Sequence, residues 1–182
     1  MSASNPPSPT PSSTPSPTPA TSSKAFSDLL AQVAIKAAAA AVFGTIETKP
    51  NSLSCQALAS AEPAFYRLFA DASHLWVALV TDNRWLSGSI EQQLTHTGDK
   101  LPDLLEEEFA DLDMPGTRPA VEHFRDEAKF FTFRSKVLSL ADAETEMQLN
   151  PLAVVTKVAT YLLAYEMCFR RLGDMEDSGE DE

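Results

Sequence analysis

The sequence lacks the patterns that mark most motif-based enzyme and metal sites. Only 6 glycines and 3 histidines occur among 182 residues. No phosphate-binding loop, dinucleotide-binding fingerprint, serine-hydrolase elbow or zinc-hydrolase helix can be found among them. The three histidines are far apart, and no base lies near either cysteine in sequence. We therefore predict a non-enzymatic protein with no catalytic residue, no cofactor and no metal.

Cysteine is almost as scarce, with Cys55 and Cys168 each in apolar surroundings and no CxxC pair. Two isolated, apolar thiols are typical of a reducing compartment, although a single bridge between them stays open. The N-terminus has neither a basic region nor an apolar core of a secretory signal. A Ser/Thr-rich start also fits a transit peptide, but it carries no arginine. We predict a soluble, cytoplasmic protein.

A long, strongly apolar run is also missing. The longest candidate, Leu29 to Gly44, has 7 alanines among its 16 residues and includes Gln32 and Lys36. A membrane span needs about 20 consecutive apolar residues, so no membrane partner is expected.

Charge is absent from residues 1–23, which hold 7 of the 13 prolines and 12 Ser or Thr. Such a segment has little to bury and should be a disordered, low-complexity tail. Whether it is phosphorylated at its Ser-Pro and Thr-Pro steps stays open. Residues 24–173 should form one globular domain, and residues 174–182 a disordered acidic tail.

The formal charge of −12 comes from two places. Residues 99–113 and 174–182 each contribute −6, whereas the rest of the chain is neutral. Acidic segments repel nucleic acid and anionic membrane surfaces, so neither is expected as a partner.

Helical periodicity predicts a mainly α-helical domain of about five helices. The expected helical segments are residues 24–47, 55–80, 87–94, 99–113, 119–131 and 151–173. Residues 75–80 and 130–140 are rich in aromatic and β-branched side chains, so one or two short strands there are the alternative.

The last helix has the clearest boundaries, with Asn150 as N-cap, Pro151 at its first position and Gly173 at its end. Its apolar face is too wide for a single exposed stripe. We therefore expect Tyr165 and Phe169 to be buried in the core rather than to form a ligand pocket.

Two candidate sites remain. In a helix over residues 119–131, Glu122 and Asp126 would share one face, as would His123 and Glu127, but an ordinary mixed-charge face explains these pairs as well as a metal does. The candidate partner surface consists of an exposed aromatic–cation pair and an acidic helix face: Arg84, Trp85, Asp103, Glu106 and Glu107. An alternative interpretation of Trp85 is a cap on the core.

The sequence thus predicts a protein-interaction or assembly factor whose helical body has an acidic face. Its partner would be a protein with a basic surface, and a homo-oligomer stays open. The alternative function is binding of a small molecule or cofactor in an aromatic-lined cavity formed by Trp76, Phe133, Tyr161 and Tyr165.

Overall fold

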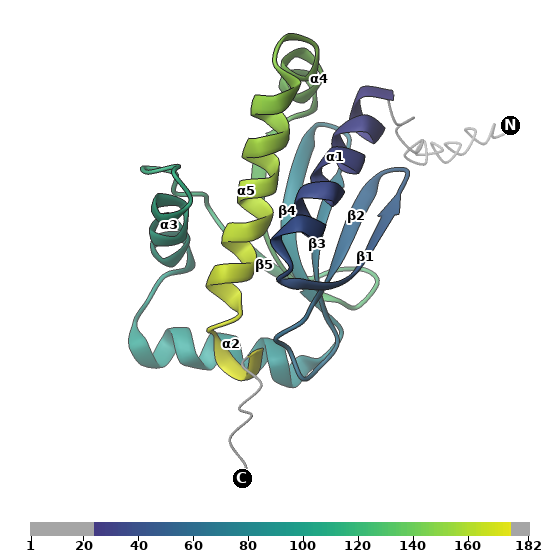
Figure 1. The fold of residues 1–182 in the computed structure, drawn as a ribbon. Helices are drawn as coiled ribbons and strands as arrows, with labels where there is room; N and C mark the ends of the chain where they lie inside the picture. The colour runs from purple at the N-terminus through teal and green to yellow at the C-terminus, as the bar shows by residue number, and fades with distance from the viewer. Residues whose placement is uncertain (1–23, 176–182) are drawn as a thin grey trace, which may run out of the picture.

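The computed structural model describes residues 24–175, and the expected N-terminal tail and residues 176–182 of the acidic tail lie outside this range. The described chain is an α+β fold around a six-stranded antiparallel sheet (Figure 1). The strands are β1 (Phe43–Lys49), β2 (Ser52–Ala57), β3 (Ala64–Ala70), β4 (His74–Thr81), β5 (Glu122–Arg125) and β6 (Phe131–Ser139). Their order across the sheet is β1-β2-β3-β4-β6-β5.

The helices lie before, between and after the strands of this sheet. They are α1 (Lys24–Ala40), α2 (Arg84–Thr97), α3 (Leu101–Asp111), α4 (Leu140–Leu149) and α5 (Pro151–Phe169), followed by the 3-10 turn η1 (Gly173–Met175). Figure 1 shows α1 and α5 side by side across one face of the sheet, with α3 beside α5 and α2 across the lower end. The sheet is therefore covered by helices on one face.

The expected mainly helical fold is wrong, because much of the chain assigned to helices forms this sheet. Residues 55–80, expected to be helical, contain the end of β2, all of β3 and all but the last residue of β4. In β3, buried Ala64, Tyr66 and Leu68 alternate with half-buried residues, which is the period of a strand. The strands proposed as alternatives near 75–80 and 130–140 are β4 and β6.

The expected helix over residues 119–131 is also wrong. Its first half contains β5, and the turn to β6 is closed by Asp126, whose carboxylate accepts a hydrogen bond from the N–H of Phe130 at 2.8 Å. Lys129 has φ +69° within this turn. The i,i+4 pairs expected from a helix therefore do not form, because residues four apart in an extended chain lie about 13 Å from each other.

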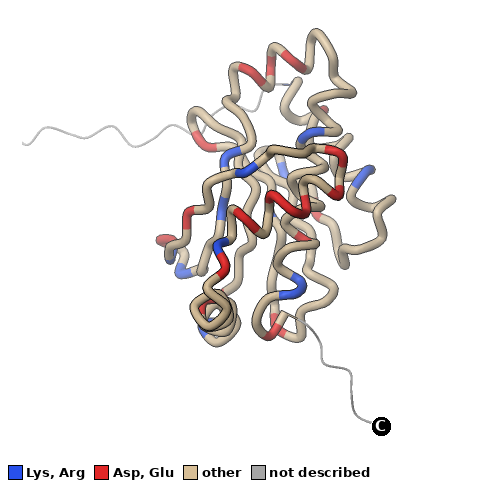
Figure 2. Tube along the Cα trace, turned by 90° about the vertical axis from the view of Figure 1, so that its left-hand side faces the viewer, with Lys and Arg blue, Asp and Glu red and all other residues tan. Residues whose placement is uncertain are grey.

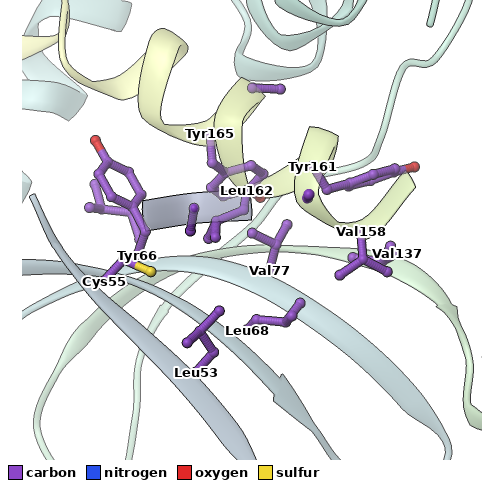
Figure 3. Close-up of a cluster of buried hydrophobic side chains, with 14 of the residues drawn as sticks. Leu53, Cys55, Tyr66, Leu68, Val77, Val137, Val158, Tyr161, Leu162 and Tyr165 are labelled. Carbon is purple, nitrogen blue, oxygen red and sulfur yellow. The ribbon is translucent and has the colours of Figure 1, made fainter. Parts of the chain in front are cut away.

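The core lies between the sheet and the helices α1 and α5. Figure 3 shows side chains of β2, β3 and β4 meeting Val158, Leu162 and Tyr165 of α5. Tyr165 and Phe169 are fully buried, and their rings lie 5.4 Å apart. The prediction that these two aromatic residues belong to the core is confirmed.

Helix α5 begins as the sequence predicted. The side chain of Asn150 accepts a hydrogen bond from the N–H of Ala153, and Pro151 occupies the first turn. By length and composition α5 alone, within residues 24–175, could cross a membrane, but 67% of its apolar window is buried inside the fold. That burial is the usual property of a core helix.

The chain beyond α5 packs against α2. Met175 is fully buried, and the N–H of Asp174 donates to Ser89 Oγ at 2.9 Å. Gly173 has φ +57°, and a Cβ there would lie 2.5 Å from Ser89 Oγ and 2.6 Å from the backbone N of Ile90. The expected domain boundary at residue 173 thus falls inside a packed turn, and the described body includes Asp174 and Met175.

Candidate docking surface on the uncovered sheet face

The face of the sheet opposite α1 and α5 carries three cross-strand rows of side chains. The strand register defines them. The middle row is Glu47, Ser54, Arg67, Ala78, Arg134 and Glu122. The flanking rows are Gln56, Phe65, Val80, Thr132 and Phe124, and Lys49, Ser52, Phe69, Trp76 and Lys136. We call these three rows the uncovered face, because no helix within residues 24–175 packs on them.

The uncovered face is unusually rich in aromatic side chains for a sheet surface in water. Phe65 and Phe69 are half-buried, and Phe124 is 36% exposed. Apolar area left in water forgoes about 25 cal/mol per Å² of stabilisation. Aromatic side chains that stay partly exposed are enriched at protein interfaces.

Arg134 lies on β6 in the middle row of this face and is held by three neighbouring side chains. Its guanidinium stacks 4.1 Å from the ring centroid of Trp76 and 4.8 Å from that of Phe124. Its Nη2 also lies 2.7 Å from the carboxylate of Glu122. Both stacking and ion pairing restrict the side chain, so Arg134 is a structural part of the face rather than a free cation.

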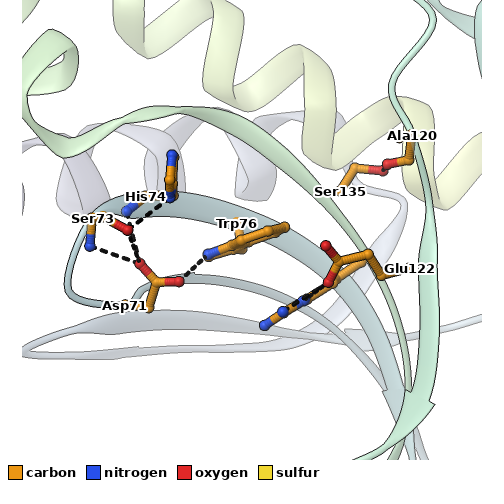
Figure 4. Close-up of polar contacts among 8 residues, drawn as sticks. Asp71, Ser73, His74, Trp76, Ala120, Glu122 and Ser135 are labelled. Atoms are coloured by element: carbon orange, nitrogen blue, oxygen red, sulfur yellow. Dashed lines mark hydrogen bonds and ion pairs between the residues drawn. The ribbon is translucent and has the colours of Figure 1, made fainter.

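Trp76 is fixed from its other end by Asp71. The indole N–H of Trp76 donates to Asp71 Oδ2 at 2.7 Å, and the N–H groups of Ser73 and His74 each donate to Oδ1 at 2.8 Å (Figure 4). Burial alone would raise the pKa of Asp71, but these hydrogen bonds outweigh it and lower the pKa below its ordinary value. The turn before β4 therefore holds a charged carboxylate that orients the indole.

A hollow of about 400 Å³ opens beside Arg134. Its lining comprises Lys49, Ser52, Ser54, Arg67, Phe69, Val80, Phe124, Asp126, Thr132 and Arg134. Ala78 forms a low point in the register between Arg67 and Arg134, which are its neighbours on the adjacent strands. Ala78 itself is fully buried beneath these two long side chains.

Three polar side chains of this hollow lack an ion-pair or hydrogen-bond partner within residues 24–175. Neither Arg67 nor Lys49 forms an ion pair with any residue of the described chain, although the Arg67 guanidinium lies 5.1 Å from the ring centroid of Phe130. Thr132 is 4% exposed, and its Oγ1 has no hydrogen-bond partner within residues 24–175. Buried polar atoms are normally paired, so the hydroxyl of Thr132 stands out.

A second hollow, of about 450 Å³, lies beside β6 next to the start of β5. Trp76, Lys136 and Tyr161 line it together with the segment Thr117–Ala120. Of the four aromatic residues expected to form one cavity, the structure brings Trp76 and Tyr161 to this hollow. Phe133 and Tyr165 are buried in the core instead, where Tyr165 Oη donates to Ser135 Oγ at 2.6 Å.

The residues of the sequence-based candidate partner surface do not form one patch. Arg84 and Trp85 start α2, and Trp85 is 84% exposed, whereas Asp103, Glu106 and Glu107 lie on α3. Arg84 and Trp85 stand at the N-terminus of α2, which is about 20 Å long, and α3 follows beyond its C-terminus. Trp85 does not cap the core.

Asp103 and Glu107 of α3 are exposed and Glu106 is half-buried; Figure 2 shows the run of acidic residues as red segments across the middle of the trace. Its charge is partly neutralised, because the guanidinium of Arg118 pairs with Asp103 and lies 3.5 Å from Glu106. On the inner side, buried Glu108 pairs with Arg171. Ion pairs within the fold therefore already neutralise part of the negative charge that the sequence suggested would bind a partner.

His123 lies in β5 and contacts α2. Its Nε2 is 3.3 Å from Ser87 Oγ and 3.6 Å from Glu91 Oε1, and its ring stacks 3.8 Å from that of Phe133. Burial lowers the pKa of His123, and Glu91 opposes this shift. Because serine and carboxylate meet the same ring nitrogen, the set lacks the relay geometry of a serine nucleophile. No group of three metal-ligating side chains occurs in the described part of the chain.

Sequence reasoning missed Arg67, Arg134, Lys49 and Thr132. A signal for two of them was present: in "FYRLFA" and "FTFRSKV", polar or aromatic residues alternate with residues that the core needs. Reading both stretches with a period of two would have placed Arg67 and Arg134 on one sheet face. Their adjacency across Ala78 depends on strand order, which the alternation does not contain.

Cys55 and Cys168 are free and buried in the structure, so the bridge left open by the sequence does not form. Burial raises the pKa of both thiols to about 12. Neither is exposed on the uncovered face.

Comparison with known proteins finds no matching family model, no matching curated protein and no matching solved structure.

Proposed function

We propose that this chain is a non-enzymatic binding protein that holds a segment of a partner protein on the uncovered face of its sheet. The observation that carries the proposal is the one-sided covering of a six-stranded sheet. An antiparallel sheet that is solvated on one face normally presents polar side chains there. Here Phe65, Phe69 and Phe124 interrupt that pattern, and a partner would remove their surface from water.

The rigidity of the face supports docking of a partner without reorganisation. Asp71 orients Trp76, and Trp76 in turn stacks on Arg134. Aromatic residues and arginine dominate the binding energy of protein interfaces because they bury much area at low entropic cost. The buried, free cysteines also agree with a reducing, cytoplasmic location.

A photo-crosslinking comparison in cells tests this proposal. Benzoylphenylalanine at Phe69 would report on the uncovered face, and the same group at Trp85 would report on the start of α2. We expect a covalent adduct with a discrete partner from position 69. The adduct should be lost when Phe65→Thr is added, since threonine keeps strand propensity but removes the ring.

Adducts from position 85 alone, or from neither position, would contradict the proposal. The first result would direct attention to the surface that includes Arg84 and the acidic face of α3. Melting of each labelled protein provides the folding control.

Small-molecule binding is the second candidate function, and the hollow at the β6 edge is the observation that favours it. Its volume of about 450 Å³ lies within the range of about 300–1,000 Å³ that is usual for ligand sites. Native mass spectrometry of protein purified from its own cells would show a bound mass. Tyr161→Ala should release that mass if the hollow holds it.

A further inference from the structure

We propose that the hollow beside Arg67 recognises an acidic side chain, so that the docked partner segment carries Asp or Glu next to an apolar residue. This inference rests on the proposed docking function and names the chemistry of its partner. The occupant is a segment of another protein; binding of a free small anion, or of this chain's own acidic C-terminal residues, would be a different result.

Two of the three cations in the hollow are not paired with a carboxylate of the described chain. Arg134 is neutralised by Glu122 at 2.7 Å, but Arg67 and Lys49 have no carboxylate partner among residues 24–175. Arginine presents a planar fork of donors that fits a carboxylate in a bidentate manner. Stacking of Arg67 on Phe130 restricts that fork and leaves its donor edge available.

The buried hydroxyl of Thr132 also lacks a hydrogen-bond partner within residues 24–175. Its Oγ1 is shielded from solvent and lacks a partner within the described chain, although the residue lines the same hollow. An unpaired buried hydroxyl has lost the hydrogen bonds that it makes to water in the unfolded chain, which is unfavourable. Because Oγ1 is closed to a water-sized group, the Thr132 side chain would have to rotate toward the hollow before its hydroxyl could donate to a carboxylate that Arg67 and Lys49 attract.

The charge around the hollow is opposite in sign to the net charge of the whole chain. The formal charge of the protein is −12. The lining of the hollow nevertheless carries Lys49, Arg67 and Arg134 against Asp126, and Glu122 beside Arg134 still leaves an excess of positive charge there. A local cationic surface on an acidic protein selects acidic partners and disfavours basic ones.

The neighbours of Arg67 specify what stands beside the acid. Phe65 and Phe69 flank it along β3, and Phe124 and Val80 close the other side of the hollow. A segment with a single carboxylate and an adjacent aromatic or aliphatic residue satisfies both kinds of surface. A highly charged segment without apolar residues would leave these rings in water.

The test uses three fluorescent synthetic peptides with a central Phe: one flanked by Glu and Asp, one by Gln and Asn, and one by Lys. Binding to the full-length protein is followed by anisotropy and by backbone NMR shifts. We expect the acidic peptide to bind at least about tenfold more tightly than the amide peptide, with shifts concentrated around Arg67 and Thr132.

Arg67→Gln should remove this preference, and Arg67→Lys should restore part of it. Arg84→Gln, which removes an exposed arginine on α2, is the matched control and should leave binding unchanged. Arg67→Glu should reverse the preference and favour the lysine peptide. This reversal requires a folded protein, so it excludes unfolding as the cause of lost binding.

Several results would overturn the inference. Equal affinity for acidic and amide peptides, with binding still lost in Phe69→Thr, would leave the docking surface intact but reject carboxylate recognition. Shifts at Arg67 that acetate or phosphate alone reproduces with the affinity of the peptide would make the hollow a small-anion site. Tighter peptide binding after deletion of residues 176–182 would make the chain's own C-terminus the occupant. Absence of binding by every peptide, together with no crosslink at position 69, would reject the proposed function itself.

Discussion

Substitution of Gly173 by alanine isolates the contact between the C-terminal turn and α2. Gly173 has φ +57°, in the left-handed region where a Cβ costs about 1–2 kcal/mol. The added Cβ would also lie 2.6 Å from the backbone N of Ile90 and 2.8 Å from the backbone C of Ser89. Backbone atoms cannot rotate away as a side chain can, so this clash requires η1 or α2 to shift.

The expected destabilisation follows from these two contributions. Overpacking of this kind costs about 1–3 kcal/mol, which brings the total to about 2–5 kcal/mol with the backbone contribution. Gly98→Ala provides the matched control, because Gly98 has φ +79° and nothing within 4 Å of its Cβ position. That variant should lose about 1–2 kcal/mol.

Urea denaturation followed by circular dichroism measures both free energies of unfolding. The difference between the two variants, about 1–3 kcal/mol, is the quantity that reports on packing against α2. Equal losses at the two positions would refute the close approach of Gly173 to α2. A truncation that ends at residue 173 should also be destabilised, since it removes buried Met175, whereas one that ends at residue 175 keeps every contact described above.

Three further predictions concern the core and the titrating groups. Phe169→Ala should lower the free energy of unfolding by about 3–5 kcal/mol, because the ring is fully buried. Leu152→Ala on the same helix, at a site that is 68% exposed, should change it by about 0.5 kcal/mol or less. Equal losses for the two variants would contradict the core assignment. Burial raises the pKa of the Cys55 and Cys168 thiols to about 12. At mildly alkaline pH both should therefore react with a thiol reagent only after unfolding, and rapid labelling in native buffer would show that they are accessible. Burial holds the pKa of His123 below its ordinary value, so the folded state binds fewer protons there, and this contribution to stability should be lost as pH falls from about 7 to 5. His123→Gln should flatten that part of the pH profile of unfolding, and an unchanged profile would contradict the assignment.

The sequence identified those elements whose local signals agree with their tertiary environment. Asn150, Pro151 and the wide apolar face of α5 all indicate a helix, and the structure has one there. The run Leu75–Val80 was ambiguous for a physical reason: both of its faces are shielded, one by the core and the other by the large side chains of the uncovered face. Strand alternation disappears when both faces are buried.

The uncovered face was not predicted because it exists only through pairing between distant strands. Arg67 and Arg134 are neighbours of Ala78 from opposite sides, although the sequence places them far apart. His123 was placed on a helix because its charged neighbours fit i,i+4 spacing, but the hairpin formed by Asp126 and Phe130 determines the local structure. Short charged segments fit both periods, and register with β6 decides between them.

The insertion of α2, α3 and β5 between β4 and its neighbour β6 has a consequence for how the chain reaches its native state. Strands β1 to β4 follow one another through short connections and can pair as they leave the ribosome, whereas β6 pairs only after residues 82–130 have been made and their ends brought together. Closing so long a loop is entropically unfavourable and slow. Until then β4, a continuous apolar strand, presents an open edge, which is the state in which neighbouring nascent chains aggregate.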